Sequence, residues 1–69
     1  MDELLTQTLN FQKAGHQTSE SLAKIGIELA KLGICDANTA KLILEKAESI
    51  GNMVSNITDE IIAIVKESS

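Results

Sequence analysis

Aromatic residues, histidine and cysteine are almost absent from this sequence. Its 69 residues include one aromatic side chain, Phe11, one histidine, His16, and one cysteine, Cys35. One cysteine cannot form a disulfide within the chain. One cysteine and one histidine are also too few ligands for a structural metal site. We therefore expect no metal or other cofactor, and the lone thiol favours a reducing, cytoplasmic location.

Basic side chains are also in the minority, with six Lys and Arg against ten Asp and Glu and a net charge of −4. Proteins that bind nucleic acids gain most of their affinity by neutralising phosphates. Here Lys13, Lys24 and Lys31 are interleaved with Glu20 and Glu28, so no basic face is formed. With a single aromatic residue for base stacking, the composition disfavours a nucleic-acid partner.

Long apolar runs are missing as well. The longest, residues 61–65, has five residues, whereas a membrane-spanning helix needs about 18. The sequence starts with Met1-Asp2-Glu3, which is acidic where a signal peptide would be basic. We therefore expect no transmembrane segment, and this start agrees with a cytoplasmic protein.

Proline is absent, glycine is sparse and strong helix formers are plentiful, which favours helix through most of the chain. The clearest interruption lies near mid-chain. Gly33 is placed as the residue after a helix end, with Ile34 next to it, as in a Schellman motif. Asp36 or Asn38 can then cap a second helix.

The predicted fold is therefore an all-α antiparallel helical hairpin that forms a single domain. Its expected limits are a helix over about 2–32, a turn over 33–38 and a helix over about 39–66 within the domain 1–69.

The second arm carries a regular heptad pattern, with apolar residues three and four positions apart. The pattern comprises Ala40, Ile43, Ala47, Ile50, Val54, Ile57, Ile61 and Ile64. Its larger members, Ile43, Ile50, Val54, Ile57, Ile61 and Ile64, are the predicted core of an oligomer.

The first arm has a weaker companion pattern, consisting of Leu4, Thr8, Phe11, Gly15, Thr18, Leu22, Ile25, Leu29 and Leu32. Thr8, Gly15 and Thr18 are its weak points. A continuous helix, with or without a kink, is the favoured interpretation, because an isolated glycine in a helix costs only about 1 kcal/mol. The alternative is a break near Gly15–Ser19, with a new cap at Thr18 or Ser19, which would give three helices.

Several apolar residues lie outside both heptad patterns: Leu5, Leu9, Ile27, Leu42, Leu44, Met53, Ile62 and Val65. Two facing helices can shelter only one stripe each, and an exposed large apolar side chain forfeits about 1.5–3 kcal/mol relative to burial. We therefore expect a homodimer that forms a four-helix bundle. A larger assembly through Ile27, Leu42 and Ile62 is the alternative.

Small uncharged polar residues gather at mid-length on both arms: Gln17, Thr18, Ser19 and Ser21 on the first, and Ser49, Asn52, Ser55 and Asn56 on the second. In a hairpin these two sets lie at a similar level. A patch without long charged side chains is easily desolvated and suits a protein partner or a small polar ligand. The predicted binding residues are Gln17, Thr18, Ser49, Asn52, Ser55 and Asn56; the alternative is an ordinary solvated helix face.

Catalytic groups are scarce. His16 and Glu20, four residues apart, are the only pair that could transfer a proton, and Cys35 has no neighbour that would activate its thiol. We therefore expect no enzyme and no catalytic residues. The predicted function is a small oligomeric interaction module, an adaptor, scaffold or inhibitor of another protein. The alternatives are a bundle that sequesters a small polar ligand between subunits and an amphipathic coat on a lipid or polymer surface.

Overall fold

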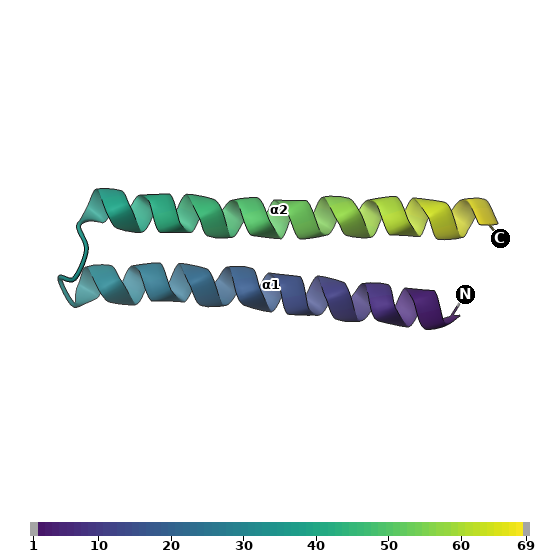
Figure 1. Ribbon diagram of the computed structural model, residues 1–69, viewed down its shortest axis with the longest axis horizontal. Coiled ribbons are helices and arrows are strands. Elements are labelled where there is room, and N and C mark those ends of the chain that lie inside the picture. The colour runs from purple at the N-terminus through teal and green to yellow at the C-terminus, as the bar shows by residue number, and fades with distance from the viewer. Residues whose placement is uncertain (1, 69) are drawn as a thin grey trace.

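The chain folds into two long helices that lie antiparallel in a single flat layer (Figure 1). The computed structural model describes residues 2–68, in which α1 spans Asp2–Lys31 and α2 spans Ala37–Ser68. The layer measures 53 × 16 × 7 Å between Cα atoms. The predicted helical hairpin is thus confirmed, with element limits within two residues of those expected.

The turn after α1 has the predicted Schellman geometry. Gly33 adopts a φ of 73°, a left-handed conformation that is strained for residues with a Cβ. The Ile34 amide donates to the Leu29 carbonyl at 3.0 Å and the Gly33 amide donates to the Ala30 carbonyl at 3.1 Å. The Ile34 side chain nevertheless stays 68% exposed, so the turn buries little apolar surface.

Asp36, rather than Asn38, caps α2. The Asp36 Oδ1 atom accepts a hydrogen bond from the Thr39 backbone N–H at 2.8 Å, as an N-cap side chain does. Bonds from the Thr39 backbone and then from its hydroxyl hold the pKa of Asp36 below its ordinary value. The carboxylate form is therefore favoured at the positive end of the helix.

The first helix runs without a break through residues 15–19, which confirms the continuous helix and excludes the three-helix alternative. The Thr8 and Thr18 hydroxyls donate to the carbonyls of Leu4 at 2.7 Å and Ala14 at 3.0 Å, four residues earlier. Gly15 is not a weak point but a place where the helices pack too closely for a side chain. A Cβ atom there would lie 2.8 Å from Val54 Cγ1 and closer still to Cγ2.

Small residues form the contact between the helices. The buried side chains among the described residues are Thr8, Ala40, Ala47, Val54, Thr58 and Val65, and Gly26 is buried too. A Cβ on Gly26 would lie 2.8 Å from Ile43, and the Ser19 hydroxyl donates across to the Ala47 carbonyl at 2.6 Å. We call this line of Thr8, Gly15, Ser19, Gly26, Ala40, Ala47, Val54 and Thr58 the inner seam.

The heptad pattern predicted for the second arm is only partly the inner seam. Its first members, Ala40, Ala47 and Val54, are buried as expected, but beyond them Thr58 and Val65 are buried while Ile57 is half-buried and Ile64 is exposed. A straight α-helix falls behind a strict seven-residue repeat by about 20° per heptad. The row that starts at Ile43 therefore turns steadily away from α1 along the helix, and Thr58 and Val65 turn towards α1 in its place.

Thr58 is an unusual member of the inner seam. Its side chain is 2% exposed, and its hydroxyl has no hydrogen-bond partner within the described residues. Thr58 lies eleven residues beyond Ala47, as Thr8 lies eleven residues before Ser19, so both threonines occupy the seam three turns from the Ser19–Ala47 bond. The inner seam is therefore polar at Thr8 and Thr58, and the buried Thr58 hydroxyl makes no hydrogen bond within the described residues.

Candidate interaction surface

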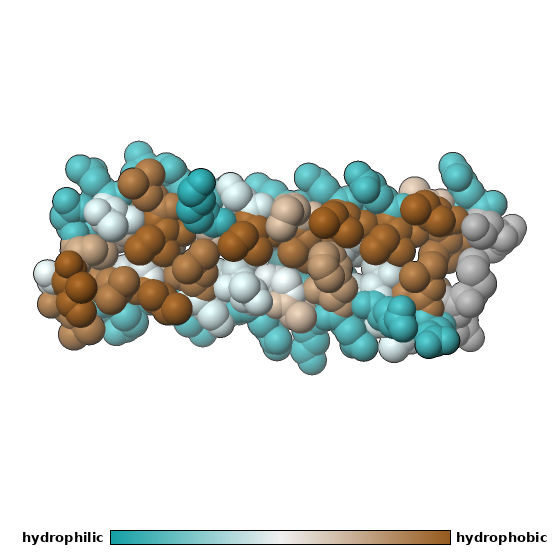
Figure 2. All heavy atoms as spheres, in the orientation of Figure 1, coloured by the Kyte–Doolittle hydropathy of each residue, from teal (hydrophilic) through white to brown (hydrophobic). Residues whose placement is uncertain are grey.

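Large apolar side chains lie outside the inner seam and mostly on one side of the layer. Figure 2 shows this side, where a hydrophobic band follows α2 and the two ends of α1. Leu22 of α1 lines one hollow together with Leu42 and Ile43 of α2, so both helices contribute to this surface. We define the apolar face by Leu4, Phe11, Leu22, Ile25, Leu32, Leu42, Ile43, Ile50, Met53, Ile57 and Ile64.

Helical geometry explains why these residues share a side. In the first arm the row Leu4, Phe11, Thr18, Ile25 and Leu32, the last just beyond α1, repeats every seven residues, which is nearly two turns. The row Ile43, Ile50, Ile57 and Ile64 in α2 repeats in the same way. Each row lies beside the inner seam, and antiparallel packing puts both on the same side of the layer. Among the predicted oligomer-core residues, Val54 is buried within the hairpin, Ile43, Ile50, Ile57 and Ile61 are half-buried, and Ile64 is 58% exposed.

The opposite side of the layer is more mixed. Leu9, Ile27 and Leu44 are exposed there, and His16 and Gly51 face each other across the helices. Ile27 and Leu42, which the sequence suggested for one further contact, lie on opposite sides of the layer. Fewer of the exposed large apolar side chains therefore lie on this side than on the apolar face.

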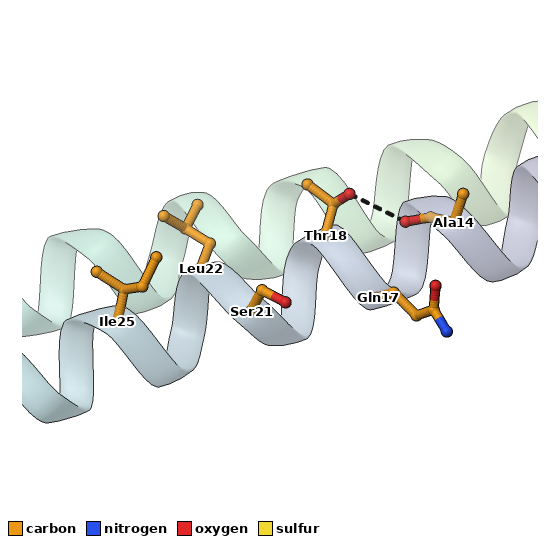
Figure 3. A pocket seen from close by; sticks show the side chains of 6 residues that line it. All are labelled: Ala14, Gln17, Thr18, Ser21, Leu22 and Ile25. Atoms are coloured by element: carbon orange, nitrogen blue, oxygen red, sulfur yellow. Dashed lines mark hydrogen bonds between the residues drawn. The ribbon is translucent and has the colours of Figure 1, made fainter.

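Three of the predicted polar residues of α1 surround a hollow of about 510 Å³ (Figure 3). Its lining is Ala14, Gln17, Thr18, Ser21, Leu22 and Ile25. Thr18, Leu22 and Ile25 project on the same side of α1 in Figure 3, and the Thr18 hydroxyl is bonded to its own helix. All six residues belong to α1, so the hollow is an open depression on the surface of one helix and not a closed cavity.

The polar residues of α2 do not join this hollow. Ser49 and Asn56 each lie two positions after a buried residue, Ala47 or Val54, and so point away from α1. Asn52 is exposed on the same outer edge, and Ser55 is half-buried. By the same geometry Gln17 points away from α2. The structure therefore does not bring the predicted polar zone together. Gln17 lies on one outer edge of the layer and Ser49, Asn52 and Asn56 lie on the other, whereas Thr18 lies in the row of the apolar face and Ser19 in the inner seam.

The titratable groups form no reactive cluster. Glu20, the only acid suggested as a partner of His16, makes an ion pair with Lys24 at 3.0 Å. Cys35 is a free, half-buried thiol in the turn. Within the described residues there is no group of three side chains able to hold a metal ion, and no helix is long and apolar enough to cross a membrane.

Comparison of the chain with protein-family models, with curated proteins and with solved structures gave no match. The functional argument therefore depends on the geometry of the hairpin itself.

Five members of the inner seam, Thr8, Gly15, Ala40, Ala47 and Val54, were in the predicted patterns, but Ser19, Gly26 and Thr58 were not, because glycine and serine signal helix breaks in a single sequence. The recurrence of small residues at Gly15, Ser19 and Gly26 on α1 and at Ala40 and Ala47 on α2 could have indicated it. Steps of four and seven residues between them place small side chains on one stripe of each helix.

Proposed function

We propose that the chain is a self-associating, non-enzymatic interaction module in which the apolar face packs against another copy to give a four-helix bundle. The outer edges and the opposite side of the layer then remain available to a further protein, so that the module serves as an adaptor, scaffold or inhibitor. We place it in the cytoplasm, where a lone thiol such as Cys35 stays reduced.

The observation that carries this proposal is the excess of exposed surface. The hairpin exposes 5097 Å², whereas a typical folded monomer of its mass exposes about 4,200 Å². The difference, roughly 900 Å², is close to the roughly 800 Å² that each partner buries in a stable protein interface. The radius of gyration, 15.8 Å, likewise exceeds the value of about 11 Å for a compact domain of this length.

Sedimentation equilibrium of the wild type and of Ile64→Asp tests self-association. Ile64 is 58% exposed in the hairpin, so a carboxylate there disturbs the isolated hairpin little but would be buried in the assembly. We expect a multimer for the wild type and a strong shift towards monomer for Ile64→Asp.

Ser49→Asp on the outer edge introduces the same side chain as a control and should associate as the wild type does. A monomeric wild type at micromolar concentration would refute the proposal.

A second candidate function is sequestration of a small polar ligand. It is favoured by the α1 hollow, in which the Gln17, Thr18 and Ser21 side chains stand beside Leu22 and Ile25. Mass spectrometry of the protein, purified natively and then denatured, would detect a bound molecule. A stoichiometric small molecule that is lost in Thr18→Leu would favour this function over the interaction module.

A further inference from the structure

Two charged residues stand symmetrically along the apolar face of α2. Lys46 and Glu60 lie seven residues before and seven residues after Met53, so that the three side chains form one row along the helix. All three are exposed, and Lys46 lines the hollow formed by Leu22, Leu42 and Ile43. Neither charge takes part in an ion pair within the described part of the chain.

On α1 a protruding side chain and a hollow lie one heptad apart, on the apolar face. Phe11, the only aromatic residue, is 40% exposed on the apolar face. One heptad further along, Thr18 occupies the place where the row of large side chains is interrupted, and the α1 hollow opens there. A large side chain is thus exposed at one position, and room for a large side chain exists at the other.

The midpoints of the two pairs lie at the same level of the hairpin. Phe11 and Thr18 are centred between Ala14 and Gly15, and Lys46 and Glu60 are centred on Met53. The close packing of the helices puts Gly15 against Val54, the residue after Met53. A single two-fold axis can therefore be placed at this level, parallel to the layer and perpendicular to both helices. It relates the position of Lys46 in one copy to that of Glu60 in the other, and the position of Phe11 to that of Thr18.

From this coincidence we propose that the occupant of the apolar face is a second copy of the chain, turned about this axis, with α1 on α1, α2 on α2 and the turns at opposite ends. In this arrangement Lys46 of each copy meets Glu60 of the other, and each Phe11 enters the hollow beside Thr18 of the other. The inference rests on the proposed self-association and adds its register and direction.

The other two-fold arrangement, with α1 on α2 and the turns together, is less complementary. It would set Lys46 against the part of the apolar face of α1 around Leu22 and Ile25, where Ser21 is the neighbouring polar residue. The next acid of that row, Glu28, lies one heptad further along and is already paired with Lys31 at 3.6 Å. Complementary charges fix register and suppress wrong arrangements more than they add affinity. The charge pattern therefore selects the arrangement with the turns apart.

Charge reversal tests the arrangement. Lys46→Glu and Glu60→Lys should each raise the dimer dissociation constant about tenfold, because each creates two like-charge contacts. The double variant should return to within about twofold of the wild type. Within one helix the two positions are about 21 Å apart, so rescue can come only from contact between copies. Sedimentation equilibrium measures the constants, and circular dichroism checks that each variant keeps its helices.

Cross-linking supplies a second measurement. In a Cys35→Ser background, Met53→Cys should be joined to Met53→Cys of the other copy by a short bismaleimide, because this position lies on the axis. Asn56→Cys, on the outer edge of α2, is the control and should not be joined.

The outcomes separate the two levels of the proposal. A monomeric wild type would overturn both the proposed function and the arrangement. A dimeric wild type without rescue in the double variant, or without cross-linking at position 53, would overturn the arrangement and leave self-association standing.

Discussion

The inner seam and the apolar face consist of opposite kinds of residue. The inner seam consists of glycine, alanine, serine, threonine and valine, so the backbones approach closely and little side-chain area is buried. The apolar face consists of leucine, isoleucine, methionine and phenylalanine, and much of it is exposed in the hairpin. Close fit within the chain is therefore separated from a larger apolar surface that stays exposed in the hairpin.

The largest effect is expected from Gly15→Val, which breaks the inner seam alone. The added side chain must overlap Val54 unless the helices separate, and overpacking of this kind destabilises by about 3 kcal/mol. Urea unfolding followed by circular dichroism measures the loss. Ser49→Val adds the same side chain on the exposed outer edge and should change the unfolding free energy by less than about 0.5 kcal/mol. Equal losses in both variants would refute the close approach at Gly15.

Thr58→Val also acts on the inner seam alone, but it should stabilise the folded protein. It replaces a buried hydroxyl that has no partner with a methyl group of similar size, which should raise the unfolding free energy by about 1 kcal/mol. The control is Thr6→Val at an exposed position of α1, which should be close to neutral. A less stable Thr58→Val variant would mean that the hydroxyl is hydrogen-bonded in the assembled protein.

Gly33→Ala tests the turn, which belongs to neither the inner seam nor the apolar face. The left-handed φ of 73° makes a Cβ unfavourable there, although nothing lies within 4 Å of the place it would occupy. We expect a loss of about 1 kcal/mol in thermal unfolding. Gly33→Asn, which tolerates this conformation better, should lose less, and the reverse order would contradict the Schellman geometry.

A smaller effect is expected from the Asp36 cap, and it depends on pH. Because the folded-state pKa of Asp36 is lowered, its contribution is present above the unfolded-state pKa and is lost as the pH falls through the folded-state value. The advantage in melting temperature of the wild type over Asp36→Asn should therefore shrink as the pH falls below the ordinary carboxyl pKa of 3.8. A difference that grows on acidification would contradict this sign.

Asn52→Arg should have the smallest effect on folding, since its side chain points away from both the inner seam and the apolar face. The melting temperature should stay unchanged. If a further protein docks on the outer edge of α2, a pull-down from the host followed by calorimetry should show weaker binding for this variant. Lys13→Ala on α1 is the control, and equal affinity of Asn52→Arg and the wild type would exclude that edge as the docking site.

The turn and the two helices could be predicted from the sequence because local chemistry determines them. Gly33 can adopt a left-handed φ, Asp36 can cap a helix, and no proline interrupts either arm. The inner seam was harder to predict, because the sequence does not show that Val54 of the other helix packs against Gly15 and leaves no room for a side chain there. Tertiary contact overrides helix propensity at such positions.

The level of the polar residues could be predicted, but not the direction in which they point. A hairpin with a turn near residue 35 brings residues around 17 and 52 to a similar level, and the structure agrees. Their direction depends on which stripe of each helix turns inward, and the glycine-rich inner seam decides that. Gln17 and Asn52 thereby come to lie on opposite edges, and their role in binding stays a prediction.

The Schellman turn and the Asp36 cap also have a consequence for the order of folding. Contact of Gly26 with Ile43 closes a loop of 17 residues across the turn, whereas contact at the level of Gly15 and Val54 closes one of 39. The entropy lost on closing a loop grows with its length. The helices should therefore pair first beside the turn, and further contacts should then form progressively towards the two termini. Pulsed hydrogen exchange during refolding should therefore protect amides near residues 26 and 43 before those near residues 8 and 58.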